Sequence, residues 1–180
     1  MHKNFRKNRK TVRQILNHHF DRFGKCDRIK MLASHLKMST LFFEKKDEEK
    51  IMIPERLAAL REKMRAYGVD AYLVPTADYH ESEYVGTYFK ARTYITGFTG
   101  SAGTAVITQD EACLWTDGRY FVQAAKELAG TGVTLMKMGQ EGVPTVEEYL
   151  AANTKEGMTI GFDGRVVNEM LGEALEKTLP

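Results

Sequence analysis

The sequence predicts an α/β domain with a mixed β-sheet flanked by helices. Short apolar runs rich in β-branched and aromatic residues alternate with stretches of helical apolar spacing toward both ends of residues 52–180, an order typical of α/β domains. In the middle of this part, two strand-like runs are separated by only three residues, which predicts a hairpin and therefore an antiparallel pair in the sheet. Hydrophobic residues make up 43% of the chain and charged residues 28%, a composition that excludes wholesale disorder.

The first elements expected in this part are an amphipathic helix and a buried strand. Pro54 suits a first helical turn, where its missing N–H costs nothing. Apolar residues then recur at helical spacing from Leu57 to Tyr67, and Gly68 can adopt the left-handed conformation that ends many helices. Residues 70–75 (DAYLVP) follow as a short strand.

The remaining strands and helices are expected to alternate along the chain. Residues 76–90 are polar and aromatic without a clear period and are expected to form a long surface loop. Further strands are expected at residues 93–96, 104–108, 112–116, 133–138 and 158–162, and further helices at residues 117–128, 144–150 and 168–179.

The formal net charge of +2 conceals two regions of opposite charge. Residues 1–51 hold 14 Lys and Arg against 6 Asp and Glu, whereas residues 52–180 hold 12 against 18. We call residues 1–51 the leader. Such a basic leader could bind phosphates or resemble a transit peptide, although it has few serines. The favoured interpretation is a flexible extension, or translated upstream sequence ahead of a true start at Met52. A nucleic acid is therefore not the expected partner.

The cysteines and the uncharged stretches exclude several classes of protein. Cys26 and Cys113 form no CxxC pair, so a zinc ribbon, a thioredoxin-type site and a disulfide framework are unsupported. The expected location is the cytoplasm, with both thiols reduced. The longest stretch without charge, residues 93–109, is too short and too polar to span a membrane, so no membrane partner is expected.

The glycine segment at residues 97–103 (GFTGSAG) matches no catalytic or phosphate-binding motif. A nucleophile elbow needs glycine two residues before its serine, and Thr99 occupies that position ahead of Ser101. The spacing GxxGxxG also differs from the GxGxxG of dinucleotide-binding turns, and a strand follows it rather than a helix. Gly97, Gly100 and Gly103 are therefore expected to allow a backbone bend and close packing.

Two polar clusters have structural interpretations that are favoured over catalysis. His80 is the only histidine near two carboxylates, and these groups are too few to predict a metal site. His80 is better explained as part of a polar loop. Asp117 is expected to accept backbone N–H groups at a helix start, and Arg119 to pair with a nearby carboxylate. Trp115, just before them, is expected in the core. The residues by themselves thus predict no catalytic set and no metal site.

Three segments in this order resemble the N-terminal, creatinase-type domain of Xaa-Pro aminopeptidases (aminopeptidase P), in the long three-domain form. They are HESEY at residues 80–84, RTYITGFTGSAGT at residues 92–104 and WTDGRYF at residues 115–121. The resemblance covers about residues 53–180 and leaves the leader without a counterpart. It implies a creatinase N-terminal-like fold with a mixed sheet flanked by helices.

The resemblance also implies a reaction for the intact family member. Such enzymes cleave the bond between an N-terminal residue and a following proline, using two divalent metals, usually manganese, held by a C-terminal "pita-bread" domain. Because this sequence ends at Pro180, before such a domain, we expect the chain alone to bind no metal and to lack peptidase activity. Peptide substrate is expected only in the full-length context.

A supporting role is what the resemblance then implies for the chain. It is expected to form a homodimer or to contact a catalytic domain, with His80, Arg92, Tyr94 and Phe98 near an active-site mouth. There an arginine can clamp a carboxylate and an aromatic ring can wall a proline subsite. The open alternatives are that Arg92 forms a surface or interdomain ion pair and that Phe98 lies in the core. For the whole chain, the alternatives are a stand-alone interaction module without peptidase activity or a nucleic-acid binder acting through the leader.

Overall fold

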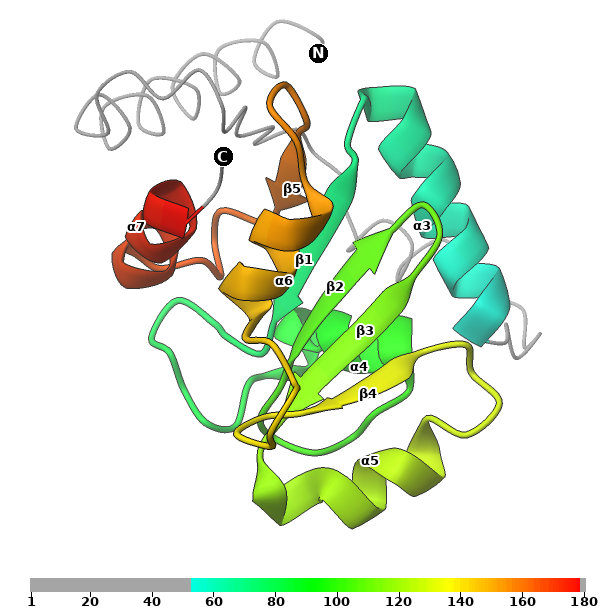
Figure 1. Cartoon of the computed structure of the whole chain (residues 1–180). Coiled ribbons are helices and arrows are strands. Elements are labelled where there is room, and N and C mark those ends of the chain that lie inside the picture. The colour runs from blue at the N-terminus through cyan, green and yellow to red at the C-terminus, as the bar shows by residue number, and fades with distance from the viewer. Residues whose placement is uncertain (1–52, 179–180) are drawn as a thin grey trace, which may run out of the picture.

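The structure, a computed structural model, describes residues 53–178, so the predicted leader lies outside the described residues. The described part contains one five-stranded sheet in the order β4-β3-β2-β1-β5 (Figure 1). Its strands are β1 (Ala71–Pro75), β2 (Thr104–Thr108), β3 (Ala112–Thr116), β4 (Thr134–Lys137) and β5 (Ile160–Phe162). The α-helices are α3 (Ile53–Tyr67), α4 (Ala91–Thr96), α5 (Phe121–Glu127), α6 (Val146–Asn153) and α7 (Glu169–Thr178), with 3-10 turns η1 (Thr87–Phe89) and η2 (Gly118–Tyr120).

The sheet is mixed, and its strand directions bring several loops to one edge. β2 is antiparallel to β1 and β3, whereas β1 pairs in parallel with β5 and β3 with β4. The ends of β1, β3, β4 and β5 and the start of β2 therefore lie at the same edge, which we call the carboxyl edge. The predicted mixed sheet and the predicted hairpin are confirmed.

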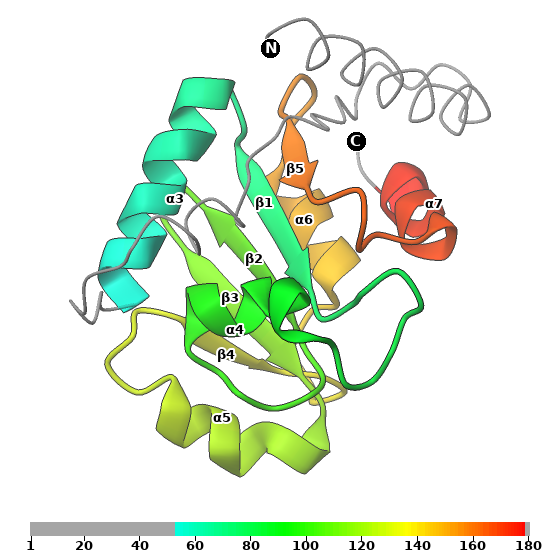
Figure 2. The same ribbon diagram turned by 180° about the vertical axis from the view of Figure 1, so that it is seen from behind.

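Helices cover both faces of the sheet, which gives three layers. On one face α3 and α4 pack against the sheet, and α4 lies in front of it in Figure 2. On the opposite face α6 and α7 pack, and α6 lies in front in Figure 1. Alternate residues of β1 supply the two cores: Tyr72 and Val74 face the α3 side, whereas Ala71 and Leu73 face the α6 side. Burial on both faces explains why β1, β2 and β3 are largely apolar runs, whereas the edge strand β4 is at most partly buried.

The strand predicted at residues 93–96 is wrong, because these residues belong to helix α4. The β-branched run TYIT favours a strand by local propensity. In the structure Arg92, Ile95 and Thr96 are buried together, and that spacing of three and four residues places them on one face of a helix. The Thr96 hydroxyl also donates to the Arg92 carbonyl at 2.8 Å, a bond within the helix. Tertiary burial has overridden the local preference.

The other predicted elements are confirmed, with ends that differ by a few residues. The helix predicted at residues 117–128 begins with the 3-10 turn η2 and continues as α5. Helix α6 starts later than expected, after a capping box formed by Thr145 and Glu148. None of the helices within residues 53–178 is long and apolar enough to cross a bilayer.

Candidate functional site

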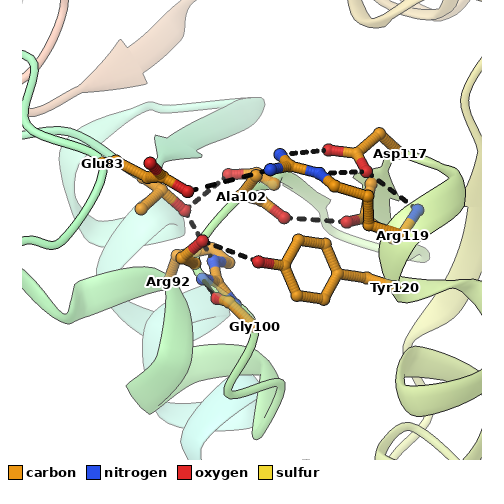
Figure 3. Close-up of polar contacts among 11 residues, drawn as sticks. Glu83, Arg92, Gly100, Ala102, Asp117, Arg119 and Tyr120 are labelled. Carbon is orange, nitrogen blue, oxygen red and sulfur yellow. Dashed lines mark hydrogen bonds and ion pairs between the residues drawn. The ribbon is translucent and has the colours of Figure 1, made fainter.

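The candidate site lies at the carboxyl edge, where three loops meet. They are the loop after β1, the glycine segment before β2 and the turn after β3, and they contain or adjoin the residues singled out from the sequence. Figure 3 shows how Arg92, Gly100, Asp117 and Arg119 approach one another in this region.

Arg92 is the residue that holds this region together. It is 3% exposed, and its guanidinium donates to the Thr76 hydroxyl at 2.9 Å, to the Phe98 carbonyl at 2.6 Å and to the Gly100 carbonyl. Burial lowers the pKa of Arg92 to about 10. The side chain therefore remains a cation near neutral pH and ties the loop after β1 to the glycine segment. The substrate-clamp role stays a prediction.

The glycines allow the bend and the close packing that the sequence predicted. Gly97 ends α4 with a left-handed φ of 79°. A Cβ added at Gly100 would lie 2.3 Å from Cζ of Phe98, and one added at Gly103 would lie 2.9 Å from the Trp115 carbonyl oxygen. No side chain fits at either position without displacement of its neighbours.

The other three residues that were expected near an active-site mouth, Tyr94, Phe98 and His80, lie in different surroundings. Phe98 is completely buried, beneath the Arg92 guanidinium at 4.7 Å and edge-on to Tyr120 at 5.8 Å. Its core position confirms the alternative interpretation for that residue. Tyr94 is partly buried below Arg56, at 4.4 Å from guanidinium carbon to ring centre. His80 is exposed, and its backbone N–H donates to Asp78. Arg92 and Phe98 thus form one cluster, and a mouth role for the four residues stays a prediction.

Asp117 and Arg119 form the turn that the sequence predicted. The Asp117 carboxylate accepts from the backbone N–H of Arg119 at 3.0 Å and from its Nε and Nη2 at 2.9 Å each. These hydrogen bonds hold the pKa of Asp117 below its ordinary value. The Arg119 side chain also lies 3.7 Å from the Glu83 carboxylate, so the predicted carboxylate pairing is confirmed (Figure 3).

Sequence reasoning missed two contacts that complete the edge. The Ser101 and Tyr120 hydroxyls lie 2.7 Å apart. The Glu127 carboxylate accepts from the backbone N–H of Thr99 at 2.8 Å and from its hydroxyl at 2.7 Å. Burial opposes ionisation of Glu127, but the bonds from Thr99 and Gln123 hold its pKa below the ordinary value. Thr99 and Glu127 are 28 residues apart, so only the three-dimensional structure brings them together.

The Asp117→Asn variant is expected to lose stability in a pH-dependent way. The folded pKa of Asp117 is lowered, so the wild-type advantage is present above the ordinary Asp pKa of about 3.9 and disappears as pH falls through the folded pKa. Because the side chain is 37% exposed, we expect a loss of only roughly 0.5 kcal/mol at neutral pH. Urea unfolding at neutral and acid pH measures it, with Asp110→Asn, an exposed carboxylate in the β2–β3 turn, as control. An Asp117→Asn deficit that persists at acid pH would contradict the prediction.

Residues 53–178 do not offer the ligands needed by the divalent metals, usually manganese, that the resemblance implies for the intact enzyme. Within residues 53–178 no three His, Cys, Asp or Glu side chains lie close enough together to hold one. We therefore assign no metal-dependent step to these residues.

Comparison with known proteins identifies the family. Residues 56–180 match the model of the Creatinase/Prolidase N-terminal domain. Aminopeptidase P2 of Arabidopsis thaliana is 41% identical over 137 residues, which are 75% of this chain and 19% of that protein. A probable Xaa-Pro aminopeptidase P of Talaromyces marneffei is 47% identical over 131 residues, 73% of this chain and 20% of that protein. The chain thus spans about a fifth of the length of these relatives.

Solved structures agree with this assignment. The X-prolyl aminopeptidase of Caenorhabditis elegans, described as a cytosolic enzyme with a di-nuclear active site, matches with a TM-score of 0.66 and 36% identity over 71% of this chain and 22% of that one. The N-terminal domain of a putative metallopeptidase from Corynebacterium diphtheriae shares the fold, with a TM-score of 0.52 and 23% identity over 71% of this chain and 89% of that one. The resemblance found in the sequence is confirmed, and the chain belongs to the creatinase/prolidase N-terminal domain family, in the form found in Xaa-Pro aminopeptidases.

Proposed function

We propose that residues 53–178 act as the non-catalytic N-terminal domain of a metal-dependent Xaa-Pro aminopeptidase and contribute to its dimer and to the mouth of its active site. The observation that carries the proposal is the architecture of the carboxyl edge, within the region that matches the family. There, Arg92 fixes the glycine segment from inside, while the loop at residues 79–84 and the side chain of Arg119 face outward.

The outward side of this edge has the chemistry of a contact surface. Tyr79, Tyr84 and Tyr88 are 64%, 79% and 53% exposed, and tyrosine is enriched in protein interfaces because it combines a large apolar ring with a polar tip. The Glu83–Arg119 pair beside them is exposed on both sides, as is typical of the polar rim around an interface core. A second copy of the chain or a catalytic domain is the partner that this surface would take.

Catalysis itself belongs, in this proposal, to a separate domain of the enzyme. Two divalent metals, expected to be manganese, would polarise the scissile carbonyl and supply a hydroxide there. The contribution of residues 53–178 is positional: a fixed edge against which a partner or a bound peptide is oriented.

An activity assay tests the division of labour. The purified 180-residue chain, incubated with manganese and an Xaa-Pro peptide, is expected to release no N-terminal residue above the level of a blank. The control is a full-length Xaa-Pro aminopeptidase assayed under the same conditions. Turnover that copurifies with the chain through successive columns would overturn the non-catalytic role.

Sedimentation tests the contact surface. We expect the chain to form a dimer in a concentration-dependent manner, and the Tyr84→Ser variant to dissociate about tenfold more readily because it loses a large interface side chain. Tyr67→Ser, which removes a tyrosine at the end of α3 that is 46% exposed, is the matched control and should behave like the wild type. A chain that stays monomeric at every concentration would contradict dimerisation through this surface.

A further inference from the structure

The segment between β1 and α4 differs from the sheet beside it because none of its residues is buried. All five residues of β1 are buried, whereas no residue from 76 to 90 is. We call residues 77–89 the strap. Figure 1 shows it as a green loop that projects from the end of β1 on the side of α7, and Figure 2 shows it from behind. Because the strap buries so little surface, its local opening costs less free energy than opening of the sheet.

The backbone of the strap makes hydrogen bonds only within residues 78–90. The N–H of Glu81 donates to the Asp78 carbonyl at 3.3 Å, and the N–H groups of His80 and Ser82 donate to the Asp78 carboxylate at 2.8 and 3.0 Å. These two bonds hold the pKa of Asp78 below its ordinary value. The second half of the strap contains the 3-10 turn η1. The strap can therefore keep its own local structure while it moves away from the sheet.

Two side-chain contacts latch the strap to the segment between β5 and α7. The Glu81 carboxylate accepts from the Asn168 side-chain amide, and the Tyr88 hydroxyl accepts from Nη1 of Arg165. Arg165 is itself fixed by Asp163, to which it donates from Nε at 2.8 Å and from Nη2 at 2.5 Å. Because Glu81, Asn168 and Tyr88 are exposed, water competes for both contacts, and each latch is weak.

Asn168 takes part in a latch and also caps helix α7. Its side-chain oxygen accepts from the backbone N–H of Leu171 at 2.8 Å, and its carbonyl accepts from that of Gly172 at 3.0 Å. The cap fixes the orientation of the side chain, so the amide N–H₂ at its other side is directed to Glu81. One side chain thus connects the strap to the first turn of α7.

The closed strap is strained at Glu81. Among the non-glycine residues of the described part of the chain, Glu81 alone has a left-handed backbone, with a φ of 56°. This conformation costs free energy in any residue that carries a Cβ. It persists where surrounding contacts over-determine it, and here the side chain of the same residue makes the contact to Asn168. Loss of that contact removes the compensation and leaves the strain.

We propose that the strap is a latched lid at the carboxyl edge, which opens as a unit when the contacts to Asn168 and Arg165 break and presents the contact tyrosines when closed. Tyr79, Tyr84 and Tyr88 all lie in the strap, so its closure places that exposed aromatic surface before a partner arrives. The link to the contact surface rests on the proposed function, whereas the latching does not.

Limited digestion with chymotrypsin, which cuts after aromatic residues, measures the opening. The 180-residue chain is digested at a concentration low enough to keep it monomeric, and mass spectrometry follows the cuts within the strap. We expect Glu81→Ala to be cut there about threefold faster, because the rate follows the fraction of open strap. Glu156→Ala, an exposed carboxylate in the turn before β5, is the matched control, and cutting after the buried Trp115 reports global unfolding. An unchanged rate in Glu81→Ala would overturn the latch.

A glycine variant separates the latch from the strain. Glu81→Gly also lacks the carboxylate, but glycine adopts a left-handed φ without steric cost. We therefore expect its strap to be cut about threefold more slowly than that of Glu81→Ala. Equal rates in the two variants would overturn the claim that the closed strap is strained at this residue.

Two variants of Asn168 separate the latch from the helix cap. Asn168→Asp keeps an oxygen for the cap, but it cannot donate to Glu81 and places a like charge beside it. We expect its strap to be cut at least about threefold faster, with wild-type hydrogen exchange at the Leu171 amide. Asn168→Ala should accelerate both the cutting and the exchange. A wild-type cutting rate in Asn168→Asp would overturn the role of Asn168 as a latch.

Protection by a partner tests the link to the contact surface. At concentrations where sedimentation shows a dimer, we expect cutting within the strap to slow at least about fivefold, since the strap is then held closed against the partner. A dimer whose strap is cut as fast as that of the monomer would overturn this link. The latch is decided separately, because its variants are measured on the monomer.

Discussion

Replacing Arg92 by alanine is expected to lower the free energy of unfolding by about 3 kcal/mol or more. The guanidinium is buried and donates to the carbonyls of Phe98 and Gly100 and to the Thr76 hydroxyl. Alanine would leave the two buried carbonyls without these donors and would open a cavity above the Phe98 ring, where the guanidinium now stacks at 4.7 Å. Urea unfolding followed by circular dichroism measures the loss.

Two further variants show whether the effect depends on the geometry of the guanidinium. Arg92→Lys keeps the charge but has one nitrogen in place of three, so we expect an intermediate loss. Arg65→Ala removes an exposed arginine that makes one exposed bond to Gln109, and it should change stability by less than about 0.5 kcal/mol. If Arg92→Ala unfolds like the wild type, Arg92 does not stabilise the contact between the loop after β1 and the glycine segment. If the equivalent change in a full-length relative lowers kcat/KM at unchanged stability, the clamp role is supported instead.

The fold was largely predictable because its signals are local. Helix α3 follows from the spacing of Leu57, Leu60 and Met64, all of which are buried as that spacing requires. The β2–β3 hairpin follows from two apolar runs separated by three residues. Helix α4 did not follow, because its stability comes from burial of Arg92 and Ile95 against distant parts of the chain, whereas its local sequence favours a strand.

The candidate site was predictable only where its partners are neighbours in sequence. Asp117 and Arg119 are two residues apart, so a cap and an ion pair could be expected from the sequence. The acceptors of Arg92 are a threonine 16 residues away and two main-chain carbonyls, and a carbonyl has no signature in the sequence. The sequence therefore did not predict the hydrogen bonds by which the buried Arg92 side chain organises the carboxyl edge, and a mouth role for Arg92 stays a prediction.

Replacing Trp115 by alanine is expected to lower the free energy of unfolding by about 3–5 kcal/mol. The indole is 1% exposed, packs edge-on to Tyr149 at 5.0 Å between ring centres, and donates its N–H to the Pro144 carbonyl at 2.7 Å. Alanine would leave a large cavity between β3 and α6 and would deprive the Pro144 carbonyl of its donor. Because Trp115 is the only tryptophan, unfolding must be followed by circular dichroism rather than by fluorescence.

The loss should also reach the carboxyl edge, because Trp115 lies in the strand that leads to Asp117 and Arg119. The strand is fixed on one side through the register of Trp115 with Met136 and on the other through Thr104, next to Gly103. We therefore expect faster amide hydrogen exchange at Gly103 and Arg119 in Trp115→Ala, as a weakened strand opens locally. Trp115→Phe keeps most of the ring and should lose about 1–3 kcal/mol, mainly through the unpaired carbonyl. Equal losses in the two variants would mean that the N–H bond, rather than the volume of the ring, anchors this strand.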